Sequence, residues 1–309
     1  MIELLATNET LLRLMAINAI LALSIYLTLA CGQLSLANAA FMGIGAYLSA
    51  VLTLNRGWPF PAVLLAAMAA PAVVALIVGL PALRLRGVFL AIATIGLGEV
   101  LRVVIINVRA TGGAEGISRI PVKTQGWHLA LALAAAAFIA WRLRGSRMGY
   151  AFEAIREDET VARTMGINTT FYKLTAFILG AALAGLAGAL RAHFVRAITP
   201  ADFGFALATE ILTFAIVGGV VSFLGPILGA VLLTILPELL RYVGLPPGWP
   251  RLLLNGTILL LVILFLPNGL ISLVTGRRRR EAPLSSSDPP DVTLEPERRV
   301  GADVGAARG

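Results

Sequence analysis

Apolar runs of about 20 residues follow one another from residue 11 to residue 273, and this succession constrains the fold more than any other feature. A helix of that length crosses the hydrocarbon core of a bilayer. The chain is 58% hydrophobic and only 14% charged, whereas a soluble domain carries about 25% charged residues. We therefore predict an all-α integral membrane protein, a polytopic bundle of about eight to ten transmembrane helices with one further helix in a cytoplasmic loop.

The runs define nine candidate spans. They cover residues 11–30, 33–54, 60–80, 88–108, 127–142, 173–192, 207–222, 224–243 and 251–273. The fifth and seventh runs are short, and only Ser222, Phe223 and Leu224 separate the seventh from the eighth, so eight or ten spans remain possible.

Positive charges favour one orientation of these spans. If the loop at 143–172 is cytoplasmic, 12 of the 25 Lys and Arg residues lie on the cytoplasmic side, and the opposite orientation places an arginine run outside. The 12 are Arg84, Arg86, Arg142, Arg144, Arg147, Arg156, Arg163, Lys173 and Arg277 to Arg280. We expect a multi-pass protein of the plasma (inner) membrane with its N-terminus outside and its C-terminus in the cytoplasm.

The two ends of this topology differ in composition. Residues 1–275 form the predicted transmembrane domain, with the charged loop at 143–172 inside it. Residues 276–309 begin with a basic run and continue with Pro, Ser, Asp and Arg but few large apolar residues. Such a segment buries too little surface to fold, so we predict a disordered cytoplasmic tail.

The charged loop contains a predicted amphipathic helix that Gly149 opens and Gly166 closes. Its apolar residues Phe152, Ile155, Ala162 and Met165 share one face, and its acidic residues crowd the rest. Four acids disfavour binding to an anionic membrane surface. Of the two remaining fates, docking on a soluble partner is favoured over packing on the protein itself.

Glycines and charges inside the spans raise separate questions. Gly180, Ala184, Gly185 and Gly188 share one side of a span and favour close helix packing. Glycine-rich stretches at 32–45 and 218–229 are either irregular segments at membrane depth or ordinary loop ends. Glu99 and Arg102 stand at i and i+3 within a span, where a structural ion pair is favoured over a functional site.

The sequence lacks the residue patterns of most chemistry. Cys31 is the single cysteine, and His128 and His193 are the two histidines, so we expect no catalytic residue and no metal site. Neither Lys123 nor Lys173 follows a glycine, as a phosphate-binding loop requires, so we expect no bound cofactor and place any use of ATP on a separate polypeptide. No basic stripe with interleaved aromatics predicts nucleic-acid binding.

Five stretches together resemble the permeases of the branched-chain amino acid ABC transporter family, and most closely their LivM-type subunit. They are GQLSLANAAFMGIGAYLSA (32–50), LRLRGVFLAIATIGLGEVLR (83–102), TGGAEGI (111–117), AFEAIREDETVARTMGINTTFYKLTAFILGAALAGLAGAL (151–190) and VGGVVSFLGPILGA (217–230). The resemblance covers about residues 11–273. The run Ala151-Phe152-Glu153 departs from the Arg-Ala-Leu-like run that the family leads us to expect.

The resemblance implies a permease subunit of an ABC importer for branched-chain amino acids. It implies as partners a second, LivH-type permease, cytoplasmic ABC ATPases that use the ATP, and an extracytoplasmic substrate-binding protein. The loop helix would be the coupling helix that contacts the ATPase. The implied coupling residues are Gly149, Phe152, Glu153, Ala154, Ile155, Glu157, Asp158, Glu159 and Gly166.

The substrate path is less defined. Gln33, Ser35, Asn38 and Thr94 are candidates by polarity and depth, although helix capping or interhelical hydrogen bonds explain each of them singly. The same family includes urea and short-amide importers. Two further hypotheses stay open: an ion-coupled secondary transporter with Glu99 as its coupling carboxylate, and a membrane scaffold whose loop recruits a soluble protein.

Overall fold

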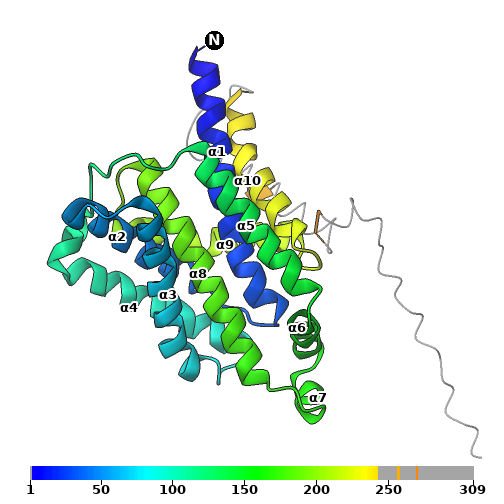
Figure 1. Cartoon of the computed structure of the whole chain (residues 1–309). Coiled ribbons are helices and arrows are strands. Elements are labelled where there is room, and N and C mark those ends of the chain that lie inside the picture. Colours follow the sequence, from blue (N-terminus) through cyan, green and yellow to red (C-terminus); the bar gives the residue numbers. More distant parts are fainter. Residues whose placement is uncertain (1, 243–255, 258–268, 271–309) are drawn as a thin grey trace, which may run out of the picture. The chain divides into compact units, whose positions relative to one another are not determined.

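A computed structural model describes residues 2–242, 256–257 and 269–270, all of which belong to one unit, Met1–Thr275 (Figure 1). Within these residues the protein is all-α, as predicted, and its extended structure is a single antiparallel bridge between Ile117 and Ile198. The longer helices are α1 (Ile2–Ala30), α2 (Asn38–Arg56), α3 (Phe60–Ala82), α4 (Val88–Asn107), α5 (Gly126–Arg144), α6 (Arg147–Glu157), α7 (Glu159–Thr164), α8 (Thr169–Val195), α9 (Phe205–Gly218) and α10 (Leu224–Tyr242). Short 3₁₀ turns lie at Arg109–Thr111, Gly113–Glu115 and Pro200–Phe203 (η3).

Six of the described helical segments are long and apolar enough to cross a membrane. They are Glu9–Ala30, Phe60–Ala82, Val88–Asn107, Gly126–Arg144, Thr169–Val195 and Pro200–Gly218. The predicted spans at 88–108, 127–142 and 173–192 therefore correspond to α4, α5 and α8. Most of the span predicted at 251–273, and the whole of 276–309, lie outside the described residues.

The second predicted span is wrong at its beginning. Residues 33–36 are irregular and α2 starts at Asn38. This irregular stretch is not a surface loop, because Gln33, Ser35 and Ala37 are all buried. A buried non-helical segment at the end of a span needs partners for its backbone groups, and other parts of this protein supply them.

Helices α2 and α8 are the most deeply buried pair and form the centre of the bundle, with α1 and α3 packed on α8 (Figure 1). Glycines allow this close approach. A methyl group at Gly185 would collide with the backbone carbonyl of Ala67 on α3, and one at Gly188 would collide with that of Met42 on α2. The small-residue side predicted for this span is therefore a packing face for three other helices.

A second glycine contact joins α9 to α10. The two helices are linked by a tight turn at residues 219–223, so the predicted break between the seventh and eighth spans exists, but α9 ends at Gly218, before the predicted end at 222. Gly218 lies against Gly225, and Gly229 lies against Gly218 and the carbonyl of Phe214. No side chain fits between these backbones, so the glycines set the distance between the helices.

The loops gather at two opposite ends of the bundle. At one end, α6 and α7 lie beyond the end of α5 and the start of α8, and the 83–87 loop reaches them through Arg86 and Glu159 (Figure 1). At the other end, the 109–125 loop contacts residues 196–198 through the Ile117–Ile198 bridge. This grouping agrees with the parity that the positive charges predict.

Candidate functional site

Residues 146–168, here called the α6–α7 segment, connect α5 to α8 and form the largest charged part of the described chain. Side chains cap each helix of this region. Ser146 Oγ accepts from the backbone N–H of Gly149, Asp158 Oδ1 accepts from those of Thr160 and Val161, and Asn168 Oδ1 accepts from that of Phe171. Such caps fix where short helices begin in water.

The single helix predicted from Gly149 to Gly166 is in fact two helices. Helix α6 begins at Arg147, and the chain becomes extended at Asp158 (φ −153°, ψ 110°) before α7. Asp158 competes for the backbone because its side chain caps the next turn, and this local preference breaks the helix. Gly149 lies in the first turn of α6, where a methyl group would collide with the carbonyls of Leu143 and Arg144.

The predicted end of the helix is confirmed at Gly166. Its φ is +82°, in the left-handed region that favours glycine. The Gly166 N–H donates to the carbonyl of Arg163, and the Ile167 N–H donates to that of Ala162. These two bonds form a Schellman motif, which satisfies the last carbonyls of α7 and turns the chain toward α8.

The apolar face of the segment packs on the protein itself. Phe152, Ile155 and Ala162 are buried and form a cluster with Cys31, which follows α1, and with Ala176 on α8. The preference for docking this face on a partner was therefore wrong. The surrounding helices cover the apolar side chains, so any partner must contact the opposite side.

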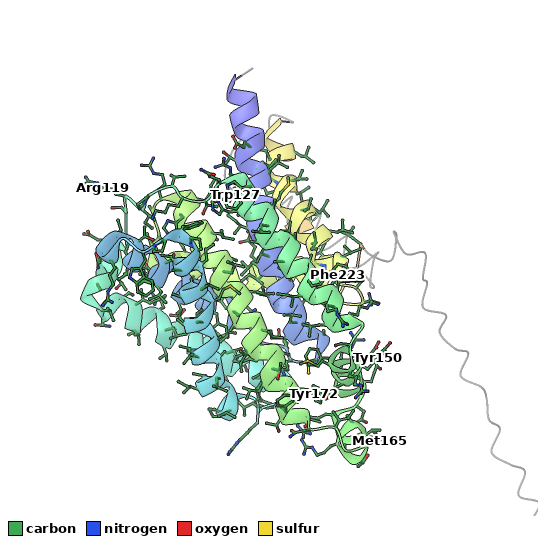
Figure 2. The ribbon with its side chains drawn as sticks, in the orientation of Figure 1. Arg119, Trp127, Tyr150, Met165, Tyr172 and Phe223 are labelled. Atoms are coloured by element: carbon green, nitrogen blue, oxygen red, sulfur yellow. The ribbon has the colours of Figure 1, made fainter. Side chains whose placement is uncertain are left out.

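Met165 does not belong to this apolar face. Its side chain is 77% exposed, and Tyr150 on α6 is 67% exposed, so both lie on the outer side of the segment (Figure 2). The break at Asp158 explains the error, because a helical wheel drawn through residues 149–166 assumes one continuous axis. Val161 also faces outward.

Glu159 joins three elements at the inner side of the segment. Its Oε2 accepts from Lys173 Nζ on α8 at 2.6 Å and lies 3.4 Å from Arg86 Nε in the α3–α4 loop. Its Oε1 lies 3.1 Å from Arg163 on α7. The Glu159 side chain is only 17% exposed. Burial alone would raise its pKa, but the Lys173 hydrogen bond and the charges of Lys173, Arg86 and Arg163 outweigh burial and hold the pKa below its usual range.

The remaining predicted coupling residues divide by exposure. Glu153 and Glu157 are exposed on α6, where both lie within 4 Å of Arg156. Ala154 is partly buried against the apolar cluster. Asp158 is exposed but serves as the cap of α7. The three residues of the acidic run 157–159 thus have different roles. Glu157 is exposed beside Arg156, Asp158 caps α7, and the mostly buried Glu159 forms ion pairs with three basic residues.

The four predicted substrate-path residues lie in and around the irregular stretch before α2. Thr94 Oγ1 on α4 accepts from the Leu36 N–H at 3.0 Å, Ser35 Oγ accepts from the Ala37 N–H at 3.3 Å, and Asn38 Nδ2 donates to Ser24 Oγ at 2.9 Å. The Asn38–Ser24 contact joins α2 to α1, the Thr94–Leu36 contact joins α4 to the irregular stretch, and the Ser35–Ala37 contact is local to that stretch. Gln33 differs, because its amide is buried and forms no hydrogen bond to nitrogen or oxygen among the described residues, and its polar neighbour is the Cys31 thiol.

Comparison with known proteins gives two kinds of similarity. The model of the family described as "Branched-chain amino acid transport system / permease component" matches residues 8–264. Over 275 residues the chain is 35% identical to the high-affinity branched-chain amino acid transport system permease protein LivM of Salmonella typhimurium (strain LT2), and 34% identical to LivM of Escherichia coli (strain K12). Each alignment covers 78% of this chain and 64% of the relative.

A shorter similarity extends to a second kind of subunit. Over 129 residues, 42% of this chain and 41% of the relative, the chain is 35% identical to the permease protein LivH of Escherichia coli (strain K12). No solved structure matches. The chain spans just under two thirds of the LivM relatives, and the family match covers most of its own length. The chain therefore belongs to the family of permease components of branched-chain amino acid transport systems.

Proposed function

We propose that this protein is a membrane-spanning subunit of an ABC importer and forms part of the path for branched-chain, hydrophobic amino acids. Its partners are a LivH-type permease, cytoplasmic ABC ATPases and an extracytoplasmic substrate-binding protein. The family match and the similarity to both LivM and LivH support this proposal. The ATP is bound and hydrolysed by the ATPase subunits, and this chain binds no cofactor.

The α6–α7 segment carries the proposal. Its inner side is fixed to the bundle by the apolar cluster around Phe152 and by the Glu159 ion pairs. Its outer side presents Tyr150, Glu153, Glu157 and Met165. Because the inner side of the segment is fixed to the bundle, a displacement applied to its exposed outer side also moves the helices to which it is attached. When the ATPases close on ATP, they move the segment, and the attached helices change between outward- and inward-facing states.

Glu159 provides one route for that movement. It contacts Lys173 at the start of α8 and Arg86 in the loop that leads into α4. Displacement of α7 would therefore act on both helices at once. The Glu159–Lys173 pair is mostly buried, so it resists separation more than an exposed ion pair does, whereas Arg86 is 62% exposed and adds a weaker link.

The same segment defines the proposed orientation in the plasma (inner) membrane. Arg84 and Arg86 in one loop, and Arg144, Arg147 and Arg163 in and before the α6–α7 segment, lie at the same end of the bundle. The positive-inside rule places this end in the cytoplasm. The N-terminus then lies outside and the C-terminus in the cytoplasm.

The test is copurification and uptake with the partner subunits coexpressed. Reversing the charges of Glu153 and Glu157 to Lys should abolish both ATPase copurification and ATP-dependent leucine uptake while membrane insertion stays normal. Asp158 and Glu159 are left intact because they hold the segment together. The matched control is Glu115→Lys, an exposed acid at the opposite end of the bundle, which should leave both readouts unchanged.

The alternatives give different results. A urea or short-amide importer would keep the ATPase and its charge dependence but move urea in place of leucine. An ion-coupled transporter would take up solute in liposomes under an ion gradient with no ATPase present, and this result would refute the proposed coupling role of the α6–α7 segment.

A further inference from the structure

A pocket opens between α4, α2 and the start of α9, in the half of α4 that lies away from the α6–α7 segment. Residues from four parts of the chain line it, and most of them are apolar: Leu36, Ala39, Ile95, Phe203, Phe205 and Ala208. One of these parts is irregular, since Leu36 precedes α2, and another is the short 3₁₀ turn η3, which ends at Phe203. Irregular backbone at membrane depth is tolerated where it lines a path or is covered by protein.

One charged side chain lies in the wall of this apolar pocket. Glu99 on α4 lines it and pairs with Arg102 one turn further along, with Oε2 and Nε 2.8 Å apart. At 1.5 Å per residue, Glu99 is about 12 Å from the Asn107 end of the helix. Glu99 therefore lies inside the span, and Arg102, about 7.5 Å from that end, lies between Glu99 and the headgroup region.

The pair is not enclosed by the described part of the chain. The Glu99 side chain is 46% exposed and that of Arg102 is 39% exposed. Their exposed neighbours on α4 are apolar residues such as Val100 and Val103. A half-exposed carboxylate and guanidinium facing acyl chains would be costly, so this face of α4 borders a watery path or another polar group.

Helix α4 also leaves space around the pocket. A methyl group at Gly96 would meet no atom within 4 Å, and one at Gly98 would meet only the Ala40 side chain at 3.9 Å. This contrasts with the glycines of α8, which lie directly against other backbones. The glycines of α4 thus do not serve helix packing within the described part of this chain, and they leave this face of α4 open.

We propose that the transported amino acid binds at the mouth of this pocket, on the exposed face of α4, with its ammonium group on Glu99 and its carboxylate on the terminal nitrogens of Arg102. The observed pair uses one carboxylate oxygen of Glu99 and only Nε of Arg102. A zwitterion placed across both side chains would form two charge-assisted contacts. Its aliphatic side chain would pack on Ile95 and on the exposed ring of Phe205. This inference rests on the proposed transport of branched-chain amino acids and names where the substrate is held.

A purely structural ion pair is the competing explanation, and an apolar double variant separates the two. Replacing a structural pair with two leucines is often neutral or stabilising for the protein. The same change removes both groups that would recognise a zwitterion. Glu99→Leu/Arg102→Leu should therefore keep the assembled importer intact and lose transport.

The experiment uses the importer reconstituted in proteoliposomes with its partner permease, ATPases and leucine-loaded binding protein. Glu99→Gln, Arg102→Gln and the double leucine variant should each lower leucine uptake at least 10-fold while copurification and substrate-free ATP hydrolysis stay at wild-type levels. The control Glu9→Gln/Arg13→Gln removes an intrahelical acid–arginine pair on α1, away from the pocket, and should transport normally.

Two results would overturn the binding site. Wild-type uptake by the double leucine variant would make the pair structural, and loss of copurification with the partner permease would assign this face to a subunit contact. The proposed function fails differently: the wild-type complex itself would then not assemble with ATPases or would move no leucine.

Discussion

The packed contact between α2 and α8, here called the seam, and the α6–α7 segment are stabilised by different interactions. In the seam, glycines bring backbones together, and a methyl group at Gly45 or Gly185 would enter the space of a neighbouring helix. In the α6–α7 segment, side-chain caps, a Schellman turn and the Glu159 ion pairs define the conformation. The α2–α8 contact thus depends on close packing of backbones, whereas the α6–α7 segment depends on hydrogen bonds and ion pairs.

The difference follows from what surrounds each region. Lipid provides no hydrophobic force between helices, so packing needs small residues and close fit. Water at the end of the bundle competes for every hydrogen bond, so short helices need caps and charge pairs to keep one geometry. Damage to the seam should therefore destroy the protein, and damage to the segment should leave a folded protein that transmits force poorly.

The largest effect is expected from Gly185→Ala. The added methyl group meets the backbone carbonyl of Ala67, which cannot move without separating α3 from α8. Overpacking of this kind costs about 3 kcal/mol. Thermal unfolding in detergent should show a large loss of stability. The control is Gly145→Ala, where the added methyl group meets nothing within 4 Å; an equal loss in that variant would contradict the packing argument.

Glu159→Gln should give the next largest effect, confined to the segment. Removing the charge leaves Lys173 mostly buried and without its carboxylate, a loss of about 3 kcal/mol when a buried pair is broken. Hydrogen exchange of residues 159–172 should accelerate while α2 and α8 stay protected. Glu157→Gln, at the exposed neighbouring position, should change exchange little. Accelerated exchange throughout α8 would show that the two regions unfold together.

Acid should reproduce part of that effect. The Glu159 pKa is lower in the folded protein than its ordinary value of 4.5, so the carboxylate stabilises the fold above pH 4.5. That contribution is lost as the pH falls through the folded pKa. A spin label on Met165→Cys, in a background with Cys31→Ala, should keep constant mobility from pH 8 to about pH 5 and become more mobile only at lower pH. The step should be absent when Glu159→Gln is added.

The smallest of these effects is expected from Asp158→Ala. The change removes the acceptor for the Thr160 and Val161 N–H groups, and an N-cap of this kind stabilises a helix by about 1 kcal/mol. The same spin label should report modest loosening of α7. Thr160→Ala, which keeps the cap, is the control. Unchanged mobility in Asp158→Ala would mean that the Glu159 ion pairs alone hold α7.

Hydropathy predicted most helices because a helix that crosses the bilayer needs about 20 consecutive apolar residues, and such a run is visible in the sequence. The glycine side of α8 was also predictable, since small residues at spacings of three and four signal close packing. The start of α2 was not, because Gln33 to Ala37 are as apolar on average as a helix end. Their irregular path is supported by Thr94, which accepts from the Leu36 N–H and lies 58 residues away in the sequence.

The α6–α7 segment shows the limit most clearly. Its charge and its final glycine were readable, but Glu159 turns inward because Arg86 and Lys173 meet it there. No local pattern reports such a meeting. The pocket beside Glu99 was missed for the same reason, since Phe203 and Ala208 come from a part of the chain more than 100 residues away. The one available signal was a charged pair inside an apolar run.

The caps at both ends of the α6–α7 segment give it the properties of an interchangeable connector. Ser146 begins it, the Gly166 turn and Asn168 end it, and its conformation is largely specified between those positions. Its surface can therefore diverge while the attachment to the bundle is preserved through Phe152, Ile155 and Glu159. After duplication of a permease, substitutions at about a dozen exposed positions of the segment would be enough to change which ATPase it binds. A chimaera that carries those positions on a related permease would bind the ATPase of the donor.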